Sequence, residues 1–251
     1  MQRDNPGRSD DACADVHWLW VQIALADRVP TVSITRMRKL LAVILFTSAV
    51  AAAQNSANSW DAGIWFAGGH SVPGGTSGVS VFDLGLRLGK VLTQDHGSAF
   101  LRGNFEYAVD LVPLYLIHQP HIVSCVSSLS GTTCAQATQT VYGGGFNPIN
   151  LKWNFTSAKH LTPYLELGGG TLFSTQNVPA GTNNVNFRTH ASLGAHLWSQ
   201  AGGSSRGVTV EVRYEHISNA GLASPNPGIN TVQAMIGINL FSNRCCFGGM
   251  R

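Results

Sequence analysis

The sequence has few charged residues and only a small excess of one sign. Aspartate, glutamate, lysine and arginine make up 12% of the 251 residues, against about 25% in average globular chains. The formal net charge is only +3, and no basic stripe is interleaved with aromatic residues. We therefore expect no nucleic-acid partner. Few charges together with 28 glycines also disfavour an ordinary cytoplasmic enzyme.

Long apolar runs and metal-ligand spacings are missing as well. After residue 54, no window holds the roughly 18 apolar residues of a membrane-spanning helix. The cysteines form no CxxC pair, and His190 and His196 are too far apart in the sequence for one metal site unaided. We therefore expect no spanning helix, no metal and no other cofactor.

An export signal stands 36 residues into the chain, at Met37. Two basic residues are followed by an apolar core and by small residues at cleavage spacing. These are Arg38 and Lys39, residues 40–46, and Ala49, Ala51 and Ala53. Residues 37–53 are therefore predicted to be a signal peptide. Residues 1–36 are interpreted as an upstream artefact or an unstructured extension.

Cysteine usage agrees with export to an oxidising compartment. Cys125 and Cys134 flank a stretch rich in serine and threonine, which suits a disulfide in a loop. Cys245 and Cys246 are adjacent and lie in a C-terminal tail, residues 242–251, for which the sequence indicates no role.

Alternation of apolar and polar residues, over segments of about ten residues, is the main structural signal. It is clear over 81–88, 100–111, 208–215 and 232–240, and weaker over 59–69, 140–155, 161–173 and 185–198. We predict an all-β fold: an eight-stranded antiparallel transmembrane β-barrel of the outer-membrane type over residues 54–241. The expected external connections are 70–78, 113–139, 174–184 and 220–230, and the expected periplasmic turns are 93–97, 156–160 and 199–206.

The polar faces of these segments carry charges of both signs. They are Asp83, Glu106, Glu166, Glu211 and Glu215, with Arg87, Arg102, Arg188 and Arg213. A soluble β-sandwich would have to bury these charges, which costs several kcal/mol for each unpaired ion. A barrel of eight strands has room inside only for side chains. We therefore expect a hydrogen-bonded filling rather than an open pore.

One predicted strand ends in residues that could carry chemistry. Its lipid-facing positions are Val208, Val210, Val212, Tyr214, His216 and Ser218. His216 and Ser218 are neighbours on one face, about 7 Å apart along the strand. An imidazole that accepts the proton of a serine hydroxyl turns it into a useful nucleophile. This position predicts an ester-cleaving pair outside the barrel wall, where the substrate would be a lipid.

The segment from His216 to Asn230, with the sequence HISNAGLASPNPGIN, resembles the active site of the lipid A 3-O-deacylase family. That family consists of small outer-membrane barrels that remove an ester-linked 3-hydroxyacyl chain from lipid A. The resemblance implies that His216 is the base and Ser218 the nucleophile. It also implies oxyanion or substrate-positioning roles for Asn219, Gly221 and Asn226, with the Gly221 amide and the Asn226 side chain as oxyanion donors.

The third member of the expected triad departs from the family. The family carries a glutamate twelve residues after the serine, where this sequence has Asn230. An amide oxygen can still accept a hydrogen bond from the histidine and hold its tautomer, although it cannot stabilise imidazolium as a carboxylate does. We predict a triad of Ser218, His216 and Asn230 that is weaker than a carboxylate version, or an inactive enzyme.

The expected function is hydrolysis of the 3-O-linked acyl chain of lipid A in the cell outer membrane of a Gram-negative-type bacterium. The partners would be lipopolysaccharide and outer-membrane lipids; the sequence leaves a monomer or a homodimer open. One alternative is a non-catalytic structural or adhesive barrel that acts through its external loops, above all the loop with Cys125 and Cys134. A weaker one is a periplasmic lipid-binding barrel.

Overall fold

A computed structural model describes residues 57–158, 161–201 and 204–242, without the side chains of 199–201 and 204–205. The predicted signal peptide, residues 1–36 and all but the first residue of the predicted C-terminal tail lie outside these ranges. Within them, the elements are β1 (Trp60–Ser71), β2 (Ser80–Val91), the 3-10 helix η1 (Ala99–Leu101), β3 (Gly103–Ser128), β4 (Gly131–Phe155), β5 (Leu161–Ser174), β6 (Val185–Ala201), β7 (Ser204–Ser218) and β8 (Ile229–Ser242).

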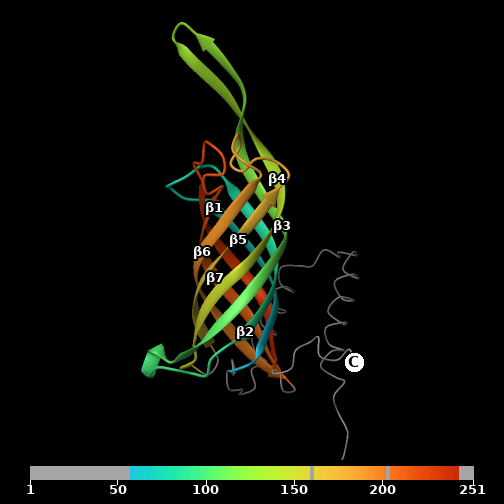
Figure 1. Cartoon of the computed structure of the whole chain (residues 1–251), viewed down its shortest axis with the longest axis vertical. Coiled ribbons are helices and arrows are strands. Elements are labelled where there is room, and N and C mark those ends of the chain that lie inside the picture. Colours follow the sequence, from blue (N-terminus) through green and yellow to red (C-terminus); the bar gives the residue numbers. More distant parts are fainter. Residues whose placement is uncertain (1–56, 159–160, 202–203, 243–251) are drawn as a thin grey trace, which may run out of the picture. The chain divides into compact units, whose positions relative to one another are not determined.

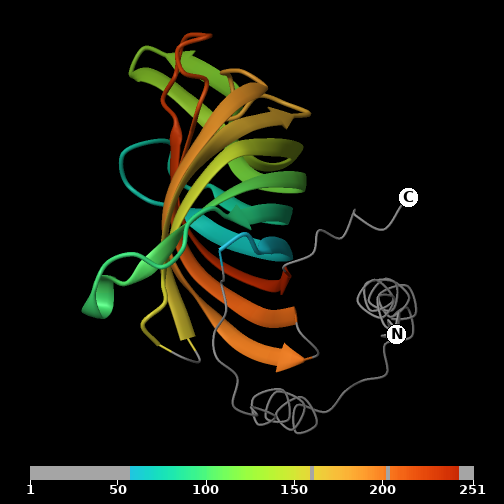
Figure 2. The ribbon, with the colours of Figure 1, turned by 60° about the horizontal axis from the view of Figure 1, so that its bottom comes forward.

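The strands form one closed antiparallel barrel in which each strand pairs with its neighbours in sequence (Figure 1). Pairing of β1 with β8, from Trp60 opposite Ser242 to Ser71 opposite Thr231, closes the ring. Figure 2 shows the strands curving around a common axis. The predicted fold class, an eight-stranded barrel of the outer-membrane type, is confirmed. No helix in the described ranges is long and apolar enough to cross a membrane.

Exposure alternates along the strands as the sequence pattern predicted. On β7, Val212 and Tyr214 are 59% and 45% exposed, whereas Arg213 and Glu215 are fully buried. Alternation with a period of two residues places apolar side chains on the outer wall and polar ones in the lumen. The wall is therefore suited to contact acyl chains.

Ion pairs fill the middle of the lumen. The Arg87 guanidinium donates to Asp110 at 2.8 and 2.9 Å and to Glu166 at 2.7 Å. Arg188 donates to Glu215 at 2.6 Å and to Asp83 at 3.0 Å. Such paired geometry, with two carboxylates on each guanidinium, offsets the cost of removing the charges from water.

Eight of the nine charged residues expected in the lumen are buried there, and Arg102 is not. Its side chain is 58% exposed and pairs with Asp95 at 3.3 Å. The prediction was wrong because the strand begins at Gly103, after η1, rather than at residue 100. Lys152, which the sequence reasoning did not single out, is buried and donates to Glu106 at 3.0 Å.

Apolar side chains fill the lumen above and below the ion pairs. Their level in the barrel follows from their positions along the strands. Towards the end that carries the β3–β4 hairpin they include Val79, Ile117, Val141, Leu172 and Val178. Towards the other end a smaller cluster contains Val91, Trp198 and Phe241. The lumen is thus filled by side chains at these levels.

The connection expected over 113–139 is almost entirely strand. β3 and β4 continue as a two-stranded hairpin to Ser128 and Gly131, and this hairpin projects beyond the barrel (Figure 1). The loop prediction was wrong because the hairpin's uncharged serines, threonines and alanines, interrupted by register shifts, give no clear alternation. In the structure a disulfide links Cys125 to Cys134, which are directly opposed residues of the two strands.

Candidate active site

His216 and Ser218 lie near the end of β7, on the outward face and at the same end of the barrel as the β3–β4 hairpin. Both are half-buried, while their neighbours Glu215 and Ile217 are fully buried in the lumen. The alternation of β7 therefore continues to its last residue. The predicted placement of both residues outside the lumen is what the structure shows.

His216 is held by the neighbouring strand. It stands directly opposite Asn230 of β8, and its Nδ1 lies 2.6 Å from Asn230 Oδ1. An amide oxygen only accepts hydrogen bonds, so this contact places the imidazole proton on Nδ1. The lone pair of Nε2 is then the one that can accept a proton from a hydroxyl.

The connection between β1 and β2 supports Asn230 and Gly228. The Val72 amide donates to the Asn230 carbonyl at 2.8 Å, and the Thr76 amide donates to the Gly228 carbonyl at 2.9 Å. A side chain at Gly74 would place its Cβ 2.7 Å from Asn230 Nδ2. Glycine at position 74 therefore leaves room for the amide nitrogen of Asn230, whose oxygen lies towards His216. Sequence reasoning missed this support, for which the paired glycines 74 and 75 were the available signal.

Gly228 lies beside the imidazole of His216, near its Cε1 and Nε2 atoms. A Cβ at this position would lie 3.0 Å from His216 Cε1 and 3.7 Å from Nε2. Its φ of +67° is also one that glycine adopts without strain. A larger residue would crowd the ring, so glycine leaves Nε2 accessible. This residue too was missed, because its role depends on the fold of the loop.

Ser218 is adjacent to His216 on the face but not bonded to it. Ser218 stands opposite Phe187 of β6, and no hydrogen bond joins its hydroxyl to His216 among the described residues. Catalytic hydrogen bonds are often long in ligand-free structures and tighten when substrate binds.

Asn219 organises the loop between β7 and β8. Its backbone amide donates to Asn226 Oδ1 at 3.1 Å, and its Nδ2 donates to the Ala223 carbonyl at 3.1 Å. Its Oδ1 accepts from the Gly221 amide at 2.9 Å. Because Asn219 is only 1% exposed, these bonds fix the loop from within.

The two expected oxyanion donors differ in availability. The Gly221 amide, at a φ of +83°, is already bonded to Asn219. Asn226 is exposed, uses only its Oδ1 towards Asn219, and keeps Nδ2 without a partner in the described part of the chain. Of the two expected donors, only the Asn226 Nδ2 is therefore left unbonded in the described part of the chain.

A second outward-facing serine and histidine form a pair at the same end of the barrel. Ser80 Oγ lies 2.9 Å from His70 Nδ1, across β1 and β2. Within the described ranges, His70 has no amide or carboxylate partner corresponding to Asn230. Sequence reasoning missed this pair, which gives a natural control for the first one.

The structure thus brings five of the six predicted residues into one loop and strand end: His216 with Asn230, and Asn219 with Gly221 and Asn226. Ser218, the last residue of β7, lies on the outward face with His216 and has no hydrogen bond to any of the five in the described part of the chain. No group of three or more histidine, cysteine, aspartate or glutamate residues in the described ranges is arranged to hold a metal ion.

Three solved structures are similar to the chain. The crystal structure of the outer membrane enzyme PagL is 17% identical, with a TM-score of 0.46, covering 70% of this chain and 97% of its own. Neisserial surface protein A is 10% identical, with a TM-score of 0.38, covering 72% and 95%. OprG from Pseudomonas aeruginosa is 12% identical, with a TM-score of 0.42, covering 74% and 96%.

Comparison of the sequence with curated proteins and with family models gives one match, to a family model. No curated protein matches the chain. The model of the lipid A 3-O-deacylase (PagL) family matches residues 124–239, just under half of the chain. The matched segment runs from the β3–β4 hairpin into β8 and includes all six predicted site residues. The chain is an outer-membrane β-barrel that carries the sequence pattern of the lipid A 3-O-deacylase (PagL) family over residues 124–239.

Proposed function

We propose that this protein is an outer-membrane esterase that hydrolyses the 3-O-linked acyl chain of lipid A. Ser218 is the nucleophile and His216 the base. The observation that carries the proposal is the 2.6 Å contact between His216 Nδ1 and Asn230 Oδ1 on the outward face. It leaves Nε2 as the proton acceptor beside a serine on a wall suited to acyl chains. The family match supports the same substrate.

The proposed reaction proceeds in two halves. Ser218 Oγ gives its proton to His216 Nε2 and attacks the ester carbonyl. The tetrahedral intermediate collapses, the sugar oxygen leaves with the proton from His216, and an acyl-enzyme remains. Water then gives a proton to His216 and attacks the acyl-enzyme, which releases the fatty acid and restores the serine hydroxyl.

Asn226 and Asn230 have separate tasks in this scheme. Asn230 holds the imidazole tautomer through its Oδ1. The Nδ2 of Asn226 donates to the oxygen that becomes negative in the intermediate, and one such donor typically lowers the barrier by about 3–4 kcal/mol. The Gly221 amide can join only by releasing Asn219 Oδ1.

Mass spectrometry of lipid A from cells that express the protein tests the proposal. The expected result is the loss of one 3-hydroxyacyl mass from lipid A when the wild-type chain is present. An unchanged lipid A profile in cells that contain the folded barrel would refute the proposed function.

Asn230→Asp is expected to raise kcat by about tenfold or more. A carboxylate of the same size would accept from His216 at the same place, and it would also stabilise the imidazolium that forms in the transition state. Initial rates on purified lipid A in detergent measure the effect. Asn230→Glu, which installs the residue typical of the family, is expected to change the rate in the same direction. Asn230→Leu, which cannot accept a hydrogen bond, is the reference. If Asn230→Asp and Asn230→Glu are both as slow as Asn230→Leu, this position does not orient or stabilise His216.

Asn226→Asp is expected to lower kcat by about 10²–10³-fold. Aspartate keeps an oxygen that can accept from the Asn219 amide, so the loop is retained, but it has no N–H to donate to the oxyanion. Kinetics should show a loss in kcat with little change in KM. Wild-type kcat in this variant would assign the oxyanion contact to another group.

A non-catalytic function through the external connections is the second candidate. It is favoured by the projecting hairpin of β3 and β4, which the Cys125–Cys134 disulfide bridges near its tip. If this candidate is right, deletion of residues 120–138 abolishes binding or adhesion while Ser218→Ala changes nothing.

A further inference from the structure

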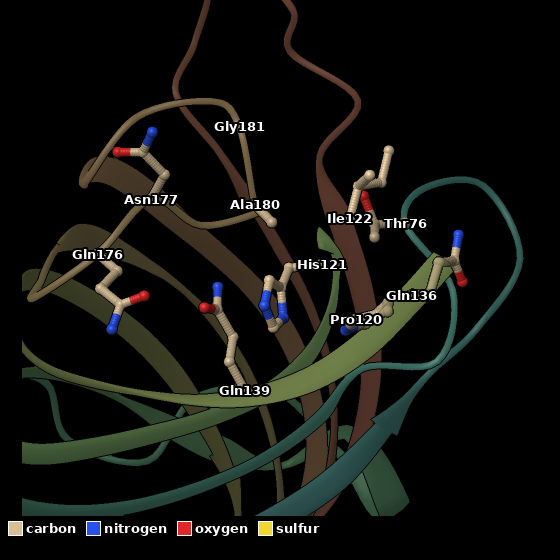
Figure 3. A pocket seen from close by; sticks show the side chains of 10 residues that line it. All are labelled: Thr76, Pro120, His121, Ile122, Gln136, Gln139, Gln176, Asn177, Ala180 and Gly181. Carbon is tan, nitrogen blue, oxygen red and sulfur yellow. The ribbon is translucent and has the colours of Figure 1, made fainter. Parts of the chain in front are cut away.

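A cavity of about 680 Å³ opens where three external connections meet. Thr76 comes from the β1–β2 connection, and residues 120–122, Gln136 and Gln139 come from the hairpin. The β5–β6 connection supplies Gln176, Asn177, Ala180 and Gly181. In Figure 3, His121 and Gln139 lie beneath the loop with Ala180 and Gly181. This volume lies within the range of about 300–1,000 Å³ that is typical of small-molecule sites.

The lining of the cavity is polar but carries no carboxylate, ammonium or guanidinium. Its polar side chains are Thr76, His121, Gln136, Gln139, Gln176 and Asn177. Each amide offers both a donor and an acceptor. Pro120 and Ile122 add apolar surface at the same wall. Such a lining disfavours phosphates and cations, and it suits a ligand rich in hydroxyl groups with apolar C–H faces.

Two polar atoms at this wall lack partners in the described part of the chain. They are Nδ1 of His121, which lines the cavity, and Oε1 of the fully buried Gln119, two residues earlier on β3. The Gln119 Nε2 donates to the Asn177 carbonyl at 2.8 Å, so the β5–β6 connection is tied to β3 at this point. Of these two atoms, His121 Nδ1 belongs to a residue that lines the cavity, where a ligand hydroxyl can supply the missing hydrogen bond.

The cavity faces outwards because apolar side chains lie on its inner side. Ile117 precedes Gln119 by two residues, Val141 follows Gln139 by two, and Val178 follows Asn177 directly. All three are fully buried members of the apolar cluster at this end of the lumen. A ligand therefore enters from the end of the barrel that carries the hairpin, rather than through the lumen.

We propose that this cavity binds a neutral saccharide. Amide, imidazole and hydroxyl groups satisfy the sugar hydroxyls, and the apolar wall packs against a C–H face. The inference goes beyond the proposed function and stands without it. One link between the two sites is Thr76, which lines the cavity and whose amide donates to the Gly228 carbonyl at 2.9 Å.

Calorimetric titration of the folded, full-length protein in detergent tests this site. The probes are lactose, maltotriose and the dephosphorylated and carboxyl-reduced core oligosaccharide released from lipopolysaccharide, with N-acetylneuraminic acid as an acidic control. We expect saturable binding of at least one neutral probe and none of the acidic one. Gln139→Leu and Gln176→Ala should each weaken binding by about tenfold, which corresponds to the loss of one or two hydrogen bonds.

Thr133→Ala is the matched control, because Thr133 is exposed on the same hairpin and does not line the cavity. Binding of the core oligosaccharide alone would identify lipopolysaccharide as the source of the sugar, and equal binding of lactose or maltotriose would identify free saccharides. Absence of binding to every neutral probe, a preference for the acidic sugar, or binding that survives both glutamine variants would overturn the proposal.

Discussion

Ser218→Ala is expected to reduce lipid A deacylation by about 10³-fold or more, to the background of the assay. In the proposed mechanism the alanine removes the atom that forms the acyl-enzyme, and residual catalysis would come from oxyanion contacts and binding alone. His216→Ala should cost as much, because the nucleophile and its base act as one unit. The double variant should be no worse than either single one. Rates of fatty-acid release from lipid A in detergent measure all three.

Ser80→Ala supplies the matched control for Ser218→Ala. Ser80 is also an outward-facing serine that contacts an imidazole, that of His70, at 2.9 Å. Its histidine has no partner like Asn230 within the described ranges, so we expect wild-type rates. If instead Ser80→Ala is inactive and Ser218→Ala is active, the chemistry belongs to the pair on β1 and β2.

Arg188→Met is expected to destabilise the barrel by about 3–5 kcal/mol. Arg188 is fully buried and bonds Glu215 at 2.6 Å and Asp83 at 3.0 Å. Methionine fills much of the same volume but leaves two carboxylates in the lumen without that cation. Urea unfolding in lipid vesicles, followed by tryptophan fluorescence or by heat-modifiable mobility on gels, measures the change.

Arg102→Met is the control for the buried ion pairs. Arg102 forms its pair with Asp95 at 58% side-chain exposure, and exposed pairs contribute about 0–1 kcal/mol. We expect the two variants to differ by several-fold in their effect on the free energy of unfolding. Equal and small effects would mean that the lumen is hydrated and that its ion pairs do not hold the barrel together.

The barrel could be predicted from the sequence because strand periodicity is local information. On β7, alternation alone placed Val212 outside and Arg213 inside, and the burial agrees. The prediction of a loop over 113–139 failed because register shifts interrupt the two-residue alternation there. The hairpin beyond residue 113 contains register shifts near Val112 and Ile122, and these move side chains to the other face without any mark in the composition.

Contacts across the lumen could not be predicted, because they depend on how the ring closes. Lys152 lies within 4 Å of carboxylates from three other strands, those of Asp61, Glu106 and Glu166. Nothing in the sequence sets these distances before the register of every strand is fixed. Gly74 and Gly228 escaped notice at the candidate site for the same reason, since each acts through a neighbour brought close by the fold.

The candidate pair could be located from the sequence because His216 and Ser218 are two residues apart and so lie on the same face of the strand. The hydrogen bonds within the loop could not be predicted. Turn geometry decides which amides are free. The Gly221 amide, which the family resemblance had assigned to the oxyanion, donates to Asn219 Oδ1 instead. Only the folded loop shows this hydrogen bond.

Covalent labelling of the folded barrel with a long-chain alkyl fluorophosphonate tests the central claim most directly. Only an activated serine that faces the acyl layer should react with this probe, and peptide mass spectrometry locates the adduct. We expect phosphonylation at Ser218, lost in His216→Ala and unaffected in Ser80→Ala. The absence of an adduct on Ser218, or equal labelling in His216→Ala, would contradict the account.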